Sequence, residues 1–311
     1  MISAEDLGEA PSPESPPRGP SVADVVRLAL GADVSRLIGA DPVARRGEDP
    51  EGVHQARVAT RRLRSHLGTF GDVLREGPTA RLRKDLRWLG RSLGTVRDLD
   101  VLKVRITSAV KQIDPLARTD GLALLSIVDA QREEADEALQ SVLTAARYRA
   151  LLETLGRVVA EPPLRKGADE PAAPYLREAI AARYRTLRDG VVALPISPLD
   201  TQLHAVRILG KPTRYAAEAG AKVLPAPCGR FAKRVTEFCD RLGDLNDGVR
   251  ASQWLDTVTG EPGRAATVAR VRTVEIGNMA EDRASWPTCW DRVRETAREL
   301  GFDEDLDGAA G

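Results

Sequence analysis

Apolar residues recur along this chain at the spacing of α-helices. In the stretch from Val53 to Leu74 they fall every three or four positions, at Ala56, Ala59, Leu63, Leu67, Phe70 and Leu74. At about 100° per residue these positions share one side of a helix, which predicts a helix packed on a core. No part of the sequence shows the alternation of apolar and polar residues, bounded by turn residues, that is typical of strands. The pattern therefore predicts an all-α fold.

The same periodicity, interrupted by glycine and proline, predicts two runs of helices. In the first run the helices cover about 22–38, from Val53 to the Gly77-Pro78 pair, 79–93, 96–114, 118–144 and 146–160. In the second run they cover about 174–194, 199–220, 227–242, 245–259, 263–283 and 287–300. The proline-rich segment 161–173 between the runs is expected to be a linker.

A second stripe follows the helix that starts at Val53, away from its apolar side, and it is basic. It consists of His54, Arg57, Arg61 and Arg64, and 150 positions later the same offsets return as His204, Arg207, Lys211 and Arg214. A recurrence of this kind predicts an internal duplication. We expect two pseudo-symmetric helical bundles with a basic surface or cavity between them, organised as a disordered tail (1–20), a first repeat (21–160), a linker (161–173), a second repeat (174–301) and an acidic tail (302–311).

Length and charge are compatible with a protein that binds anions. The chain has 311 residues, 42% of them hydrophobic, which is enough for a substantial core in one or two domains. Its 46 Lys and Arg balance 46 Asp and Glu, but acidic residues gather at both ends, so the folded body is expected to be positive. No apolar run reaches the roughly 20 residues of a membrane span and no secretory leader is recognisable. We expect a cytoplasmic protein without a membrane partner.

Two other motifs invite a catalytic interpretation, and neither is favoured. The acids of Gly94-Thr95-Val96-Arg97-Asp98 recur in Gly243-Asp244-Leu245-Asn246-Asp247. They are read as a helix end followed by a capping box, or as partners for arginines, rather than as a metal or acid–base site. Gly90-Arg91-Ser92-Leu93-Gly94 matches the GxSxG pattern of hydrolases, but no strand precedes it to form the required turn.

His54 and His66 lie about 18 Å apart on one helix and cannot share an ion. No metal or cofactor is predicted.

The ordered motifs resemble the CHAD domain family over about 22–300. The resemblance is carried by the run from Val53-His54-Gln55-Ala56-Arg57 to Arg61-Arg62-Leu63-Arg64, by Arg87-Trp88-Leu89 with the block 93–101, and by the blocks 203–215 and 242–247. It implies a helical protein of two related bundles that binds inorganic polyphosphate and has no established catalytic activity. This chain departs from the pattern at Pro212-Thr213, and a proline within a helix removes a hydrogen bond and can bend it. Many relatives carry a triphosphate-hydrolysing domain upstream, and we expect any enzymatic partner of this chain to be separate.

The interpretation that follows is a polyphosphate-binding module that is not an enzyme. Besides the two stripes, the expected contacts are Lys84 and Arg87 of the third helix, and Lys233 and Arg234 of its counterpart. A place in the cytoplasm with polyphosphate granules fits this function, and protein partners stay unknown. The alternatives are a scaffold for nucleic acid or for an acidic protein, and a metal-dependent phosphohydrolase. Nucleic acid is disfavoured because aromatic residues make up only 4% of the chain. A phosphohydrolase would need a carboxylate cluster that the sequence does not show.

Overall fold

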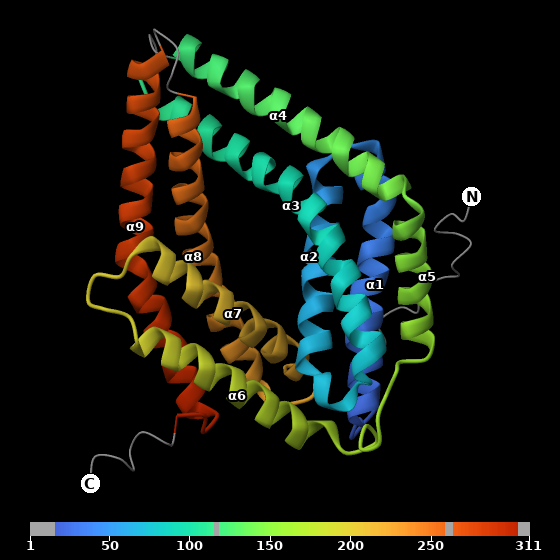
Figure 1. Ribbon diagram of the computed structural model, residues 1–311. Helices are drawn as coiled ribbons and strands as arrows, with labels where there is room; N and C mark the ends of the chain where they lie inside the picture. The colour runs from blue at the N-terminus through green and yellow to red at the C-terminus, as the bar shows by residue number, and fades with distance from the viewer. Residues whose placement is uncertain (1–15, 115–117, 259–263, 304–311) are drawn as a thin grey trace.

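The fold is all-α, as predicted. The computed structural model describes residues 16–114, 118–258 and 264–303, and within them it contains α-helices and one short 3-10 helix but no β-strand (Figure 1). The elements in chain order are α1 (Val22–Arg46), α2 (Pro50–Thr69), η2 (Gly71–Val73), α3 (Glu76–Gln112), α4 (Arg118–Thr144), α5 (Ala146–Ala160), α6 (Ala172–Val192), α7 (Asp200–Gly220), α8 (Ala226–Thr257) and α9 (Arg264–Glu299). Most of the two predicted tails, 1–15 and 304–311, lies outside the described residues.

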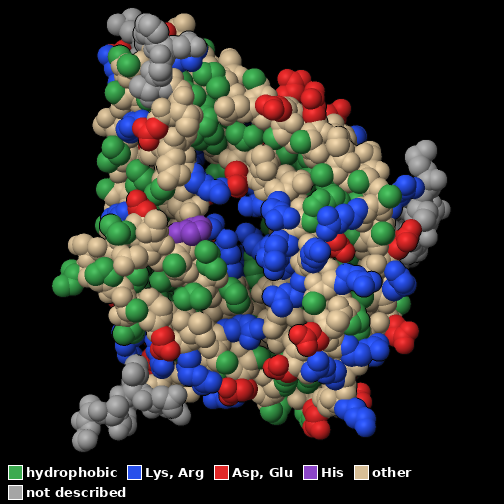
Figure 2. Space-filling model, viewed as in Figure 1, with side chains coloured by type: hydrophobic (Ala, Val, Ile, Leu, Met, Phe, Trp, Pro, Cys, Tyr) green, Lys and Arg blue, Asp and Glu red, His purple; other side chains and the backbone are tan. Residues whose placement is uncertain are grey.

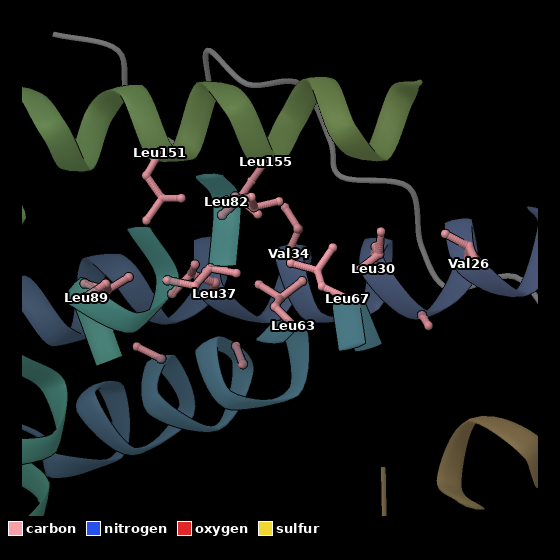
Figure 3. Packing of buried hydrophobic residues seen from close by; sticks show 14 of the residues in the cluster. Val26, Leu30, Val34, Leu37, Leu63, Leu67, Leu82, Leu89, Leu151 and Leu155 are labelled. Carbon is pink, nitrogen blue, oxygen red and sulfur yellow. The ribbon is translucent and has the colours of Figure 1, made fainter. Parts of the chain in front are cut away.

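Three apolar clusters hold the helices together. The first joins α1, α2, α5 and the first half of α3, and Figure 3 shows leucines such as Leu37, Leu63, Leu82 and Leu151 pointing toward one another from these four helices. The second cluster joins α6 and α7 to the first half of α8 and the last part of α9. These clusters form the two opposite sides of the molecule. The duplication that the stripes suggest stays a prediction.

The third cluster closes the structure into a ring. The long helices α3 and α4 extend away from the first cluster and meet α8 and α9 at the far end (Figure 1). The contact is apolar, with Ile106 of α3 and Val128 of α4 fully buried with Leu255 of α8 and Val271 of α9. Because this contact and the packing of α2 near α7 join the two sides at separate places, the space between them is enclosed by helices.

Helix α2 shows why the local sequence folds as it does. Asp49 accepts a hydrogen bond from the Glu51 N–H, and Pro50 opens the helix at a position where the missing N–H costs nothing. Gly47, with a φ of 71°, ends α1 in the left-handed conformation that glycine adopts without strain. The predicted apolar side of α2 is buried, which leaves the basic stripe facing away from the first cluster.

Several predicted helix boundaries are wrong, because glycines and prolines do not end the helices there. Helix α3 runs unbroken through Gly94-Thr95, and α8 runs through Gly243-Asp244, so the predicted capping boxes do not exist. A glycine inside a helix costs only about 1 kcal/mol, less than packing on two clusters provides. The Gly77-Pro78 pair lies in the first turn of α3, where proline is tolerated. Helix α9 likewise continues through Pro287.

Helix α7 also continues through its proline. The exposed Pro212 cannot donate to the carbonyl of Ile208, and the next residue, Thr213, donates its hydroxyl to Leu209 O at 3.2 Å. Nothing interrupts the helix between Asp200 and Gly220. The basic residues of the second stripe therefore stay on one helix.

The connecting and terminal segments pack more closely than the sequence suggests. The predicted linker 161–173 is tied to the start of α1, where the Val22 N–H donates to Glu170 O at 2.9 Å. Phe302 and Asp303, assigned to the acidic tail, are buried, and the Tyr184 hydroxyl donates to Asp303 at 3.0 Å. The second helical unit therefore extends past residue 301, because an apolar side chain and a satisfied carboxylate hold its end.

Candidate anion-binding cavity

A cavity of about 730 Å³ lies inside the ring of helices. Figure 2 shows it as a central hollow, with Lys and Arg side chains crowded along the side formed by α2 and α3 and histidine on the opposite side. Its charged lining consists of six bases and two carboxylates: Arg57, Arg61, Arg97, Arg207, Lys211, Arg250, Asp98 and Asp247. Six positive against two negative groups leave an excess of four when Lys211 is protonated. A cavity with walls of this kind concentrates anions.

Helix α2 contributes Arg57 to the cavity through a close approach to α3. The Arg57 guanidinium donates to Gly90 O at 3.2 Å and to Asp98 at 3.3 Å. It crosses α3 directly above Gly94, where a Cβ atom would lie 2.2 Å from Arg57 Nη1. Gly94 therefore serves as a space for the guanidinium, which explains a glycine in the middle of a long helix.

Helix α7 contributes Arg207, and this arginine also lies over a glycine. A Cβ atom at Gly243 of α8 would lie 3.5 Å from Arg207 Nε, an ordinary contact distance. The two arginines thus cross the partner helices at glycines that occupy equivalent places in the repeated motif. A Cβ atom would clash with Arg57 at Gly94, whereas at Gly243 it would make an ordinary contact with Arg207.

Buried nitrogen atoms of the cavity lack hydrogen-bond partners. Among the residues that the structure describes, no partner is present for Arg61 Nε, His204 Nδ1 or Arg207 Nε. An unpaired buried polar group costs free energy, about 1–3 kcal/mol, and in folded proteins such groups are usually satisfied. Two of these three atoms are guanidinium donors, so an acceptor that enters the cavity would find N–H groups already oriented.

Lys211 lies on α7 among guanidiniums. Burial, followed by the charges of Arg207, Arg61 and Arg57, lowers its pKa to about 7. An anion in the cavity would raise this pKa, because an opposite charge favours the protonated form. The protonation of Lys211, and with it the net charge of the cavity, therefore depends on whether an anion is bound.

His54 responds to the same environment. Burial and then the charge of Arg97 lower its pKa, with smaller contributions from Arg61 and Arg57, while Glu51 opposes them. The imidazole is thus neutral in the empty cavity near pH 7. A bound anion would favour its protonation.

Asp98 accepts hydrogen bonds from two of the arginines that line the cavity. It lies on α3 and accepts hydrogen bonds from Arg57 of α2 and from Arg250 of α8. The alternative that the acids of this motif pair with arginines is therefore confirmed for Asp98, whereas its capping role is wrong. One carboxylate holds together bases from both sides of the ring.

Arg97 and Arg250 are cavity residues that the sequence interpretation did not select. Arg97 stands three positions after Gly94, and Arg250 stands seven positions after Gly243. Positions three, four and seven apart share a face of a helix. Once α3 and α8 are recognised as continuous, the faces that hold the two glycines identify both arginines.

Half of the predicted binding residues line the cavity, namely His54, Arg57, Arg61, His204, Arg207 and Lys211. The others lie elsewhere. Arg214 is paired with Glu218 and Asp240, and Arg234 with Glu237. Lys84 and Arg87 of α3 and Lys233 of α8 are exposed and do not line the cavity. Arg64 faces Arg83 and Arg87, whose charges, after burial, lower its pKa.

The structure offers no metal cluster at this place. No group of three or more His, Cys, Asp or Glu side chains able to hold a metal ion occurs within the described ranges. His66, the remaining histidine, is buried against Asp33, with its Nε2 3.3 Å from Oδ2, and does not line the cavity. In the same part of the chain, every helix is too short or too polar to cross a membrane.

Comparison with known proteins gives a family match and two curated relatives. The model of the CHAD domain matches residues 28–256. Two curated proteins from Mycobacterium tuberculosis, Uncharacterized protein MT2285 (strain CDC 1551 / Oshkosh) and Uncharacterized protein Rv2226 (strain ATCC 25618 / H37Rv), are each 31% identical to it over 266 residues. The aligned region covers 82% of this chain and 48% of each relative. The chain thus spans about half the length of the curated relatives it matches.

Two solved structures share the fold. The crystal structure of the CHAD domain from the plant Ricinus communis aligns with a TM-score of 0.73 and 26% identity, covering 90% of this chain and 97% of that one. PptA from Streptomyces chartreusis aligns with a TM-score of 0.71 and 20% identity, covering 87% of this chain and 99% of that one. At the lower identity the likeness concerns the fold alone.

Proposed function

Because the chain belongs to the CHAD domain family, we propose that it binds inorganic polyphosphate in the basic cavity between α2, α3, α7 and α8. Successive phosphates are held by guanidiniums from both sides of the ring, through charge-assisted and often bidentate hydrogen bonds. The role is binding without turnover, in the cytoplasm and at polyphosphate granules.

The observation that carries this proposal is the set of unpaired donors in a cavity with excess positive charge. Six bases converge on one space, and buried nitrogens of Arg61 and Arg207 have no acceptor within the described residues. A compact ligand with many oxygen acceptors and a high density of negative charge satisfies both features at once. Polyphosphate, with a charge on each phosphate, has this chemistry.

The lining of the cavity disfavours the rival functions. The residues described as lining it include no Phe, Tyr or Trp, so nucleic acid bases would find no surface for stacking. Its carboxylates, Asp98 and Asp247, come from opposite sides, and Asp98 is engaged by two arginines. Metal-dependent phosphoryl transfer uses metal ions held by carboxylates that are free to coordinate them.

The decisive measurement is a titration with polyanions of defined length at two salt concentrations. Affinity should rise steeply from pyrophosphate to chains long enough to contact both α2 and α7, and then rise slowly, because the second contact becomes intramolecular. Long chains should also lose more affinity with salt, since each neutralised phosphate releases counterions. Equal affinity for pyrophosphate and long chains, or tighter binding of single-stranded DNA, would contradict the proposal.

A pair of matched variants tests the place of binding. Changing Arg57, Arg61, Arg207 and Lys211 together to alanine should abolish binding and leave the helical circular dichroism intact. The control changes Lys84, Arg87, Lys233 and Arg234 to alanine, which removes the same number of bases from outside the cavity. Its affinity should stay within about threefold of the original, since exposed charges act weakly through screened solvent. A larger loss in the control would assign binding to these bases outside the cavity.

A further inference from the structure

One amine in the cavity is surrounded by positive charge and has no acidic partner. Lys211 is half-buried on α7, and its charged neighbours are Arg207 on the same helix and Arg57 and Arg61 from α2, with the Cys239 thiol of α8 beside it. Among the described residues no carboxylate lies within ion-pair distance of Lys211. The carboxylates of the cavity are engaged elsewhere, because Asp98 accepts from arginines and Asp247 accepts from Asn246 at 3.2 Å.

These surroundings make the amine reactive. A lysine beside other cations, withdrawn from water, loses its proton easily, and the neutral amine is the nucleophilic form. With a pKa of about 7 in the empty cavity, roughly half of Lys211 is neutral at pH 7 before an anion binds. An exposed lysine with an ordinary pKa near 10.4 is neutral in only about one molecule in 2,500 at that pH.

The neighbouring guanidiniums determine which electrophile reaches the amine. They attract phosphate groups, and they stabilise a phosphate that departs with additional negative charge. An acyl phosphate, the mixed anhydride of a carboxylic acid and phosphoric acid, presents such a group next to an electrophilic carbonyl carbon. The cavity thus combines the nucleophile with a binding site for the leaving group.

We propose that Lys211 is an acylation site that reacts with acyl phosphates held in the cavity. The neutral amine attacks the carbonyl carbon and a C–N bond forms. The bond between that carbon and the bridging phosphate oxygen breaks, its electron pair leaves with inorganic phosphate, and the nitrogen releases a proton to water. The product is a neutral amide, which removes one of the six basic charges. The inference rests on the proposed function of the same cavity. It implies that acylation weakens polyphosphate binding, because a basic charge is lost.

The test exposes the folded protein to acetyl phosphate and follows each lysine by peptide mass spectrometry. The exposed Lys84, Lys166, Lys222 and Lys233 serve as internal controls. At pH 7 Lys211 should be acetylated at least about tenfold faster than these four, since its larger neutral fraction outweighs the lower nucleophilicity of a weaker base. With acetyl phosphate well below saturation, the rate reflects the pKa of Lys211 in the empty cavity, so it should level off above about pH 7. The exposed lysines should continue to gain roughly tenfold per pH unit. If Lys211 reacts no faster than the exposed lysines, the inference is wrong.

Two additional arms separate this inference from the proposed function. An acetylating N-hydroxysuccinimide ester, which carries no phosphate, should show a smaller preference for Lys211; an equal preference would contradict the role of the guanidiniums. Long polyphosphate should protect Lys211 from acetyl phosphate. Selective acetylation without protection would contradict polyphosphate binding in the cavity and support the acylation site, whereas protection of a lysine that reacts no faster than the controls would do the reverse.

Discussion

Arg62 of α2 donates a hydrogen bond to Glu218 of α7, joining helices that belong to opposite sides of the ring. The same guanidinium donates to Asp33 of α1 at 2.9 Å, and the other oxygen of Glu218 accepts from Arg214 at 2.8 Å. Arg62 also lies over the ring of Tyr215, with its Cζ 5.3 Å from the centroid. This chain of charges fixes the distance between α2 and α7, the helices that present the two basic stripes.

Removing the buried member of this network should destabilise the fold. Asp33 is 2% exposed and is placed between Arg62 and His66. Asp33→Asn should lower the free energy of unfolding by about 3 kcal/mol, because it removes the charged acceptor of Arg62 Nε and the carboxylate beside the buried His66. Glu218→Gln should cost less, about 1 kcal/mol, since its side chain is 22% exposed. Urea unfolding measures both, and equal losses would show that burial does not decide the effect.

The glycines under the two cavity arginines should respond differently to alanine. At Gly94 a Cβ atom would lie 2.2 Å from Arg57 Nη1 and would displace the guanidinium, so Gly94→Ala should weaken polyphosphate binding about tenfold. At Gly243 the corresponding distance to Arg207 Nε is 3.5 Å, so Gly243→Ala should bind normally. It should also gain about 0.5–1 kcal/mol of stability as alanine replaces glycine within a helix. Equal affinities of the two variants would show that Arg57 does not depend on this space.

Binding should weaken as pH rises above 7. The pKa of Lys211 is about 7 in the empty cavity, and a bound anion raises it. Between these two pKa values binding takes up a proton, so affinity falls with rising pH by up to about tenfold per unit. About one unit or more below pH 7, Lys211 is mostly protonated in both states and contributes little slope. Calorimetry from pH 7 to 9 in buffers of different ionisation enthalpy measures the uptake. Lys211→Arg should bind without that slope, and a slope retained in this variant would assign it to other groups.

The carboxylate that now accepts from Arg57 and Arg250 should compete with the ligand. Asp98→Asn should bind pyrophosphate about three- to tenfold more tightly. In this variant the ligand no longer has to break the ion pairs of Asp98 with Arg57 and Arg250. Asp247→Asn is the matched control, since it removes the same charge from the cavity but its described partner is Asn246. It should gain less. If both variants gain equally, the general field of the cavity, and not competition for the two arginines, controls affinity.

The sequence was sufficient for the fold class and for the residues near the start of each stripe. Apolar periodicity identified the buried side of α2, and the recurrence of His54, Arg57 and Arg61 in α7 identified half of the predicted set as cavity residues. Arg64 and Arg214 continue the pattern, but they lie beyond the cavity on their helices, and Arg214 contacts acidic partners there. Spacing alone does not show where a cavity ends along a helix.

The long helices were the main feature that local sequence did not predict. Gly94 and Gly243 resemble helix ends because glycine is common there, and only the guanidinium of a distant helix explains them otherwise. Arg97 and Arg250 were missed for the same reason, since a predicted break at those glycines removes the helical face that the residues share. Contacts between residues separated by 41 and 152 positions, such as those of Asp98, define the site.

The third apolar cluster counteracts charge repulsion in the protein without ligand. By joining α3 and α4 to α8 and α9, it holds together two walls whose like charges repel each other across the cavity. In the unoccupied protein, leucine, isoleucine and valine contacts at one end therefore oppose the repulsion between basic side chains that line the cavity. An anionic chain bound as proposed would reduce this repulsion by adding negative charge to that of Asp98 and Asp247, so binding would also stabilise the folded protein.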